Sequence, residues 1–271
     1  MAAEKSVQSI GMFDSGIGGL TVMQKVMQAL PNESIVYFGD TARVPYGGKS
    51  SETIVRYSIE NSIFLLEKNI KILVIACNTA ASAAIVKLCT IFNIPVVGVI
   101  EPGAEKAVSV TRNARIAVLG TRSTIHSGAY QREIEKRLPG VKVFSIACPL
   151  FVPLVEEGMI HQPFARAIVK EHLAPLKHQG VDTIMLGCTH YPILKSLIQE
   201  EMGPEIALVD SGTTCAEKVA AILRDQALES PKDHVAEHRY FVSDDPAKFR
   251  ESAERIFGQP ISHVHAATLW T

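Results

Sequence analysis

Short runs of branched apolar residues alternate with longer helix-period segments along almost the whole 271-residue chain. Continuous Val/Ile-rich runs are typical of parallel strands buried on both faces, and parallel strands need helical connections between them. The alternation therefore predicts an α/β fold with mainly parallel sheets. The expected strands span residues 9–13, 35–38, 72–76, 96–99, 116–119, 141–146, 183–186, 206–209 and 240–242, and the main expected helices span residues 20–29, 52–68, 80–92, 127–137, 163–177 and 216–226.

Two patterns at the ends of predicted strands occur twice. Residues 10–16 and 206–212 both end in Asp-Ser-Gly, and residues 73–79 and 183–189 both carry a cysteine followed by a polar residue. Open α/β sheets bind ligands at the carboxyl ends of their strands, so these repeats favour two sheets with chemistry at matching edges. Turn formation alone explains the Asp-Ser-Gly repeat equally well, but it explains the cysteine repeat less well.

Composition and charge exclude several classes of protein. The 27 Lys and Arg residues nearly balance the 28 Asp and Glu residues, so the chain lacks the basic excess that nucleic acids favour. Five cysteines without a C-x-x-C pair are typical of a reducing compartment and lack zinc-site spacing. The N-terminus has no apolar signal core, and the apolar stretch 72–86 is shorter than the ~20 residues of a membrane span. We therefore expect a cytoplasmic protein without a membrane partner and without direct nucleic-acid binding.

The glycine-rich turn after the first predicted strand does not match a nucleotide-binding motif. G-x-G-x-x-G starting at Gly16 would need glycine at position 21, which is Thr21. The phosphate-loop pattern ending in Gly-Lys-Ser at residues 48–50 would need glycine at position 43, which is Arg43. Two interpretations of residues 15–19 stay open. Their backbone N–H groups could bind an anion such as a carboxylate, or the segment is an ordinary strand-to-helix turn.

Cys77 and Cys188 each follow an apolar strand and lead toward a helix, whose N-terminus lowers the pKa of a thiol. A Cys/His hydrolase would use Cys188 with His190 and would leave Cys77 without a role. Two equivalent thiols suit racemisation better, because a proton leaves one face of a carbon while another arrives on the opposite face. The other cysteines are predicted to be small buried apolar residues: Cys89, Cys148 and Cys215.

Six segments, in order, resemble the glutamate racemase family and together cover most of the chain. They are residues 11–22, 39–47, 76–80, 120–121, 153–158 and 187–192. One departure is Ala81, where the family often has Ser or Thr.

This resemblance implies a racemase that needs no cofactor and has two doubly wound, pseudo-symmetric domains with the active site in the cleft between them. The first domain would contain residues 1–98 plus 211–271, and the second would contain residues 99–210. Cys77 and Cys188 would be the two bases, with Asp14 beside the first thiol and Glu156 and His190 serving the second. The substrate-binding positions implied by the family are Asp14, Ser15, Tyr46, Gly47, Asn78, Thr79, Thr121, Thr124, Thr189 and His190.

The resemblance also implies glutamate as the small-molecule substrate, D-glutamate supply for peptidoglycan synthesis, and a homodimer. Hydroxyl, amide and backbone N–H groups can hold two carboxylates and an ammonium without a metal. The nearest alternative is an aspartate or broad-specificity racemase. The pattern at the second thiol of aspartate racemases resembles Gly-Cys-Thr-Glu, whereas this chain has His190 at the last of these positions. A two-lobed amino-acid-binding protein is a different class, but such proteins are usually exported and we expect no signal peptide here.

Overall fold

The structure is a computed structural model that describes residues 5–269. Residues 1–4 and 270–271 lie outside the described residues, so part of the N-terminal segment in which we expect no signal peptide, and both ends of the first predicted domain, are not covered. Within the described part, the strands form a six-stranded sheet in the order β10-β9-β2-β1-β3-β4 and a four-stranded sheet in the order β6-β5-β7-β8. All paired strands are parallel, which confirms the predicted α/β class.

The larger sheet contains β1 (Ser9–Asp14), β2 (Ile35–Gly39), β3 (Ile70–Ile75), β4 (Val96–Gly98), β9 (His238–Val242) and β10 (Val264–Ala266). The smaller sheet contains β5 (Arg115–Gly120), β6 (Lys142–Ala147), β7 (Thr183–Gly187) and β8 (Ala207–Asp210). The helices are α2 (Leu20–Ala29), α3 (Ser51–Leu66), α4 (Asn78–Ile91), α5 (Ile100–Val110), α6 (Arg122–His126), α7 (Ala129–Arg137), α8 (Phe151–Glu156), α9 (Pro163–Leu173), α10 (Lys195–Met202), α11 (Ser211–Asp225) and α12 (Pro246–Phe257). Four short 3-10 helices join them: η1 (Thr41–Arg43), η2 (Tyr46–Gly48), η3 (Ala174–Leu176) and η4 (Tyr191–Leu194). No helix in the described range is long and apolar enough to cross a membrane.

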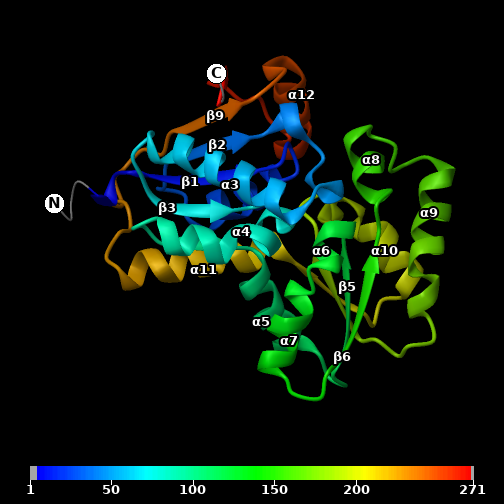
Figure 1. Ribbon diagram of the computed structural model, residues 1–271. Helices are drawn as coiled ribbons and strands as arrows, with labels where there is room; N and C mark the ends of the chain where they lie inside the picture. The colour runs from blue at the N-terminus through cyan, green and yellow to red at the C-terminus, as the bar shows by residue number, and fades with distance from the viewer. Residues whose placement is uncertain (1–4, 270–271) are drawn as a thin grey trace.

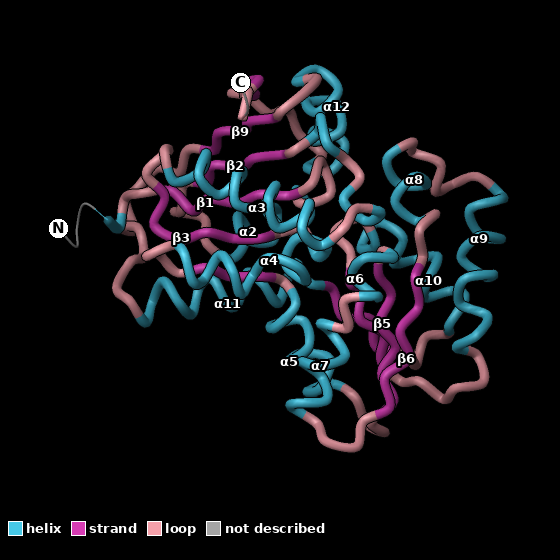
Figure 2. The backbone as a smooth tube through the Cα atoms, viewed as in Figure 1, coloured by secondary structure: helices cyan, strands magenta, loops and turns pink. Residues whose placement is uncertain are grey.

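Helices cover the strands of both sheets, as Figure 2 shows in cyan against magenta. Strands β2 and β3 of the larger sheet and β7 of the smaller sheet are buried along their whole length, as continuous apolar runs predict. Helix α3 packs against α4, and α2 packs against α11. Beside the smaller sheet, Figure 1 shows α5 and α7 on one side and α9 and α10 on the other.

The apolar core under the larger sheet continues into one face of the smaller sheet. Ile116, Val118, Tyr130 and Met185, all from the segment that carries the smaller sheet, belong to the same buried cluster as strands β1 to β3. The opposite face of the smaller sheet has a separate core, which includes Leu173. The proposed domain boundaries at 98/99 and 210/211 separate the strands of the two sheets, while this core crosses them, so the division into domains stays a prediction.

Several elements differ from the sequence-based prediction. Helices α5, α6, α8, α10 and α12 and strand β10 were not among the expected elements. Helix α11 begins at Ser211 rather than at residue 216, because the Asp210 carboxylate accepts a hydrogen bond from the backbone N–H of Thr213 at 2.8 Å and caps the helix. The prediction that Cys89 is buried is wrong, since it lies on the exposed face of α4.

Candidate active site

A cavity of about 400 Å³ lies at the carboxyl ends of strands from both sheets. Segments that follow β1, β3, β5, β6 and β7 all reach it, as expected for parallel α/β sheets. Most of the site residues expected from the sequence line this cavity: Ser15, Tyr46, Gly47, Cys77, Asn78, Thr79, Thr121, Glu156, Cys188, Thr189 and His190. Two expected residues, Asp14 and Thr124, are buried just behind its wall.

Cys77 forms one wall of the cavity at the start of α4. It is 5% exposed, and its Sγ accepts a hydrogen bond from the backbone N–H of Ala80 at 3.5 Å and lies 3.6 Å from the Ser15 hydroxyl. Burial and, to a smaller extent, the nearby Asp14 carboxylate outweigh the opposing contacts with Ala80 and Ser15 and raise the pKa of Cys77 to about 12. The helix N-terminus therefore does not give this thiol the lowered pKa that its sequence position predicts.

The Asp14 carboxyl group lies behind the Cys77 thiol and is completely buried. Its Oδ2 atom accepts a hydrogen bond from the backbone N–H of Gly16 at 2.9 Å, while Oδ1 has no hydrogen-bond partner among the described residues. Burial raises the pKa of Asp14, and the positive charge of His190 partly offsets that rise. A buried carboxylate oxygen without a donor is costly, so Oδ1 is suited to receive a proton or an ammonium group.

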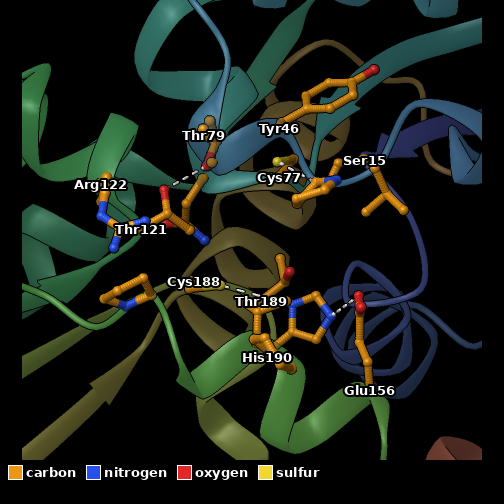
Figure 3. Close-up of a pocket in the computed structure, with 18 of the residues that line it drawn as sticks. Ser15, Tyr46, Cys77, Thr79, Thr121, Arg122, Glu156, Cys188, Thr189 and His190 are labelled. Atoms are coloured by element: carbon orange, nitrogen blue, oxygen red, sulfur yellow. Dashed lines mark hydrogen bonds and ion pairs between the residues drawn. The ribbon is translucent and has the colours of Figure 1, made fainter.

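Cys188 faces the cavity from the end of β7, next to an imidazole–carboxylate pair (Figure 3). Its Sγ lies 3.8 Å from His190 Nδ1, and His190 Nε2 lies 3.0 Å from Glu156 Oε1 at the end of α8. Burial lowers the pKa of His190, but the contacts with Cys188 and Glu156 outweigh burial and raise it to about 10. His190 is therefore an imidazolium at neutral pH, and its positive charge lies next to the Cys188 sulfur.

The segment after Cys188 differs from the helix start expected there. The backbone continues into the single-turn 3-10 helix η4, and α10 begins only at Lys195. Cys188 therefore does not cap an α-helix, and its charged neighbour is His190 rather than a helix N-terminus.

The glycine-rich turn at residues 15–19 allows the start of α2 to approach the loop that follows Cys188. A Cβ atom on Gly18 would lie 2.3 Å from Thr189 Oγ1 and 2.4 Å from His190 Cε1, so no side chain fits at this position. The Thr21 hydroxyl donates a hydrogen bond to the Thr189 carbonyl at 2.8 Å. This turn is thus the contact that holds the start of α2 against the loop carrying the second thiol.

Tyr46 contributes its ring and backbone to the cavity wall rather than its hydroxyl group. In Figure 3 the Tyr46 hydroxyl points away from the two thiols. It donates a short hydrogen bond to Asp40 and accepts one from Asn61 Nδ2 at 3.1 Å. Arg43 completes this buried cluster with an ion pair to Asp40 at 2.7 Å. An ion pair and hydrogen bonds on the side away from the thiols therefore hold the loop that carries Tyr46 and Gly47 in place.

Three threonine hydroxyls form a cluster at the cavity wall, beginning with Thr79, which follows Asn78 in the sequence. Thr79 Oγ1 lies 2.9 Å from Thr121 Oγ1 and 3.2 Å from Thr124 Oγ1, and the latter two are 3.0 Å apart. Thr121 also caps α6 through the backbone N–H of Thr124. Thr124 thus supports the two threonines that line the cavity instead of lining it directly.

Sequence reasoning missed several residues of the cavity wall. An exposed arginine follows Thr121, and a mostly apolar strip lies around the start of α8. Three further residues lie in the loop between β2 and α3. The residues concerned are Val44, Pro45, Gly48, Arg122, Pro149, Val152, Pro153 and Glu157. The strip follows the carboxyl end of β6, so the rule that sites form at strand ends would have found it. Across residues 5–269, no group of three or more His, Cys, Asp and Glu side chains is arranged to hold a metal ion.

Comparisons with known proteins agree with this arrangement over nearly the whole chain. The family model for Asp/Glu/hydantoin racemases matches residues 10–219. A glutamate racemase from Geobacter metallireducens is 50% identical over 262 residues, which cover 97% of both chains. Among solved structures, a glutamate racemase isoform from Bacillus anthracis has a TM-score of 0.94 at 38% identity, with 97% of this chain and 98% of that chain covered. A Francisella tularensis glutamate racemase in complex with D-glutamate has a TM-score of 0.91 at 35% identity, with the same coverage.

Proposed function

Because this chain belongs to the Asp/Glu/hydantoin racemase family, we propose that it interconverts L- and D-glutamate with two thiols and no cofactor. The chain is an isomerase, an amino-acid racemase like the glutamate racemases to which it is similar. In our proposal, Cys77 and Cys188 exchange protons with opposite faces of the α-carbon. Each proton that one thiolate removes is replaced by a proton from the other thiol.

The observation that carries this proposal is the pairing of each buried thiol with its own acid–base group. Cys77 has the Asp14 carboxyl group behind it, and Cys188 has the His190 imidazole, which is itself paired with Glu156. The two thiols come from the strand ends of different sheets and reach the same cavity. A single-nucleophile hydrolase would leave one of these two sets unused.

By the family's assignment, L-glutamate is deprotonated by Cys188 and D-glutamate by Cys77. For the L-enantiomer, the Cys188 thiolate takes the α-proton while the Cys77 thiol donates its proton to the opposite face. The product is D-glutamate, with a thiol at Cys188 and a thiolate at Cys77. Asp14 and His190 then return the two sulfur atoms to their starting protonation states by proton exchange with solvent.

The α-hydrogen of an amino acid is weakly acidic, so the carbanion needs stabilisation from the cavity. Hydrogen-bond donors around the substrate carboxylates supply it in a site shielded from water. The Asn78 amide and the hydroxyls of Thr79, Thr121 and Thr189 are donors of this kind, and all four residues line the cavity. The unpaired Oδ1 atom of Asp14 is the matching acceptor for the substrate ammonium or for the Cys77 proton.

We further propose that the product D-glutamate enters peptidoglycan synthesis, as it does for the family. Two observations favour glutamate over aspartate. The similar structure from Francisella tularensis was solved with D-glutamate, and this chain has His190 at the position where the aspartate racemase pattern has Glu. The homodimer and the cytoplasmic location stay predictions from the sequence.

Circular dichroism of the purified protein with L-glutamate, without added cofactor, tests the proposal. The ellipticity should decay to zero as the racemic mixture forms. The same measurement with L-aspartate should be slower by orders of magnitude, because the shorter side chain leaves buried polar groups without partners. Equal rates with both amino acids would indicate a broad-specificity racemase, and no decay with glutamate would contradict the proposed function.

A further inference from the structure

The side-chain amide of Asn78 is held from behind by two residues that are distant in the sequence. Asn78 is the first residue of α4, directly follows Cys77 and lines the cavity. The Tyr130 hydroxyl, from α7, donates a hydrogen bond to Asn78 Oδ1 at 2.6 Å. Asn78 Nδ2 donates to the hydroxyl of Ser211, the first residue of α11, at 3.3 Å. The amide therefore has one hydrogen-bond partner on each of its two ends.

The Tyr130 ring is fixed in place by close packing on two sides. Tyr130 is 2% exposed. A Cβ atom on Gly187 would lie 3.0 Å from the ring, and one on Gly103 would lie 3.4 Å from it. Burial raises the pKa of Tyr130 well above its ordinary value, so the hydroxyl keeps its proton and remains a donor throughout the neutral range. Asn78 thus faces a rigid donor that cannot become an anion under working conditions.

These two hydrogen bonds define the orientation of the amide in the structure. The Tyr130 hydroxyl donates to Oδ1, and the NH₂ group of Asn78 lies on the side of Ser211. Ser211 accepts one N–H, and the second N–H of the NH₂ group is left for a ligand. We propose that Tyr130 is a positioning residue that holds the Asn78 amide with its N–H group toward a substrate carboxylate.

This inference rests on the proposed function, since glutamate carries the carboxylate that Asn78 would bind. An amide turned by 180° would present its carbonyl oxygen to that carboxylate, and two acceptors repel each other. Without the Tyr130 hydroxyl, Oδ1 loses its hydrogen-bond donor and the amide is less firmly held. The expected consequence is weaker substrate binding rather than slower chemistry, because the amide contacts bound substrate and transition state alike.

Steady-state kinetics of Tyr130→Phe test the proposal, since the substitution keeps the buried ring and removes only the hydroxyl. We expect KM for glutamate to rise about three- to tenfold, with kcat nearly unchanged. The matched control is Tyr240→Phe, which removes a hydroxyl from another buried tyrosine, 3% exposed, on β9. The control should leave KM unchanged, and thermal unfolding of both variants separates a loss of stability from a loss of binding.

A double-mutant cycle shows whether Tyr130 acts through Asn78. In an Asn78→Ala background, the additional Tyr130→Phe substitution should not change KM further. An equal rise in KM in both backgrounds, or an unchanged KM for Tyr130→Phe alone, would overturn the positioning role while the proposed function stands. A wild-type protein that does not racemise glutamate would overturn both.

Discussion

Replacing Glu156 with Gln changes one charge next to the second thiol and leaves the shape of the side chain almost unchanged. The glutamine carbonyl can still accept a hydrogen bond from His190 Nε2, 3.0 Å from Glu156 Oε1 in the native protein. A hydrogen bond to a charged group contributes about 1.5–3 kcal/mol, and a neutral one about 0.5–1.5 kcal/mol. The substitution therefore removes about 1.4 kcal/mol of stabilisation of the imidazolium, which lowers the pKa of His190 by about one pH unit.

The pH dependence of activity follows from that shift. In the wild-type protein, the positive charge on His190 is present at neutral pH and is lost as the pH rises through about 10. We expect kcat/KM to fall over that range, because the positive charge beside the Cys188 sulfur disappears. In Glu156→Gln, the fall should begin about one pH unit lower, so kcat/KM should be nearly unchanged at neutral pH and up to about tenfold lower above about pH 10.

Racemisation alone cannot locate this defect, because L- and D-glutamate have equal free energies. The values of kcat/KM in the two directions must therefore be equal in every variant. Elimination of chloride from each enantiomer of 3-chloroglutamate needs only one deprotonation and reports one face at a time. Above about pH 10, Glu156→Gln should slow elimination from the L-form up to about tenfold and leave the D-form unchanged. Equal slowing of both forms, or an unchanged NMR titration of the His190 imidazole, would refute this reasoning.

Three further predictions concern the thiols, cofactors and the fold. Cys77→Ser and Cys188→Ser should each abolish racemisation, because a hydroxyl is far too weak an acid to form the base, yet Cys77→Ser should still eliminate chloride from the L-form and Cys188→Ser from the D-form. Elimination from the same enantiomer by both variants would contradict the two-base assignment. Dialysis against a chelator and a carbonyl reagent should leave the racemase rate unchanged, whereas a loss that pyridoxal phosphate restores would show that a cofactor is needed. Lys71→Met should lower the free energy of unfolding in urea by about 3–5 kcal/mol, because Lys71 Nζ pairs with the buried Glu33 carboxylate at 2.5 Å. A change below about 1 kcal/mol would contradict it.

The sequence predicted the parallel strands well because their burial follows directly from local composition. Strands β2 and β3 are apolar runs that are buried at every position. Helix α5 was missed because Pro102 and Gly103 near its start argue against a helix. Pro102 is tolerated in the first turn, where its missing N–H has no helical partner, and Gly103 lies where the Met185 side chain would contact a Cβ atom at 2.8 Å. That second reason depends on the tertiary structure and cannot be derived from local sequence.

Within the candidate site, contacts between neighbours in sequence were easier to predict than contacts across the fold. Cys188 and His190 are two residues apart, so their pairing followed from the sequence itself. Glu156 could be distinguished from Glu157 only through the family resemblance. Asp14 approaches Cys77 because β1 and β3 are adjacent, a register that the sequence does not specify. The raised pKa of Cys77 also has a nonlocal cause, since burial by the whole fold outweighs the local effect of the helix start.

The buried cluster shared by the two sheets restricts how this chain can be recombined with its relatives. Tyr130 and Met185 belong to the segment of the smaller sheet, but they pack into the core beneath the larger one. A chimera joined at residues 98/99 and 210/211 would combine the two sides of this seam from different parents. Matched volumes at the seam are then needed before either parental sheet can pack normally, because close-packed interiors absorb few changes in side-chain size. A chimera that takes all residues of the shared cluster from one parent preserves that fit. The useful crossover points therefore lie away from 98/99 and 210/211.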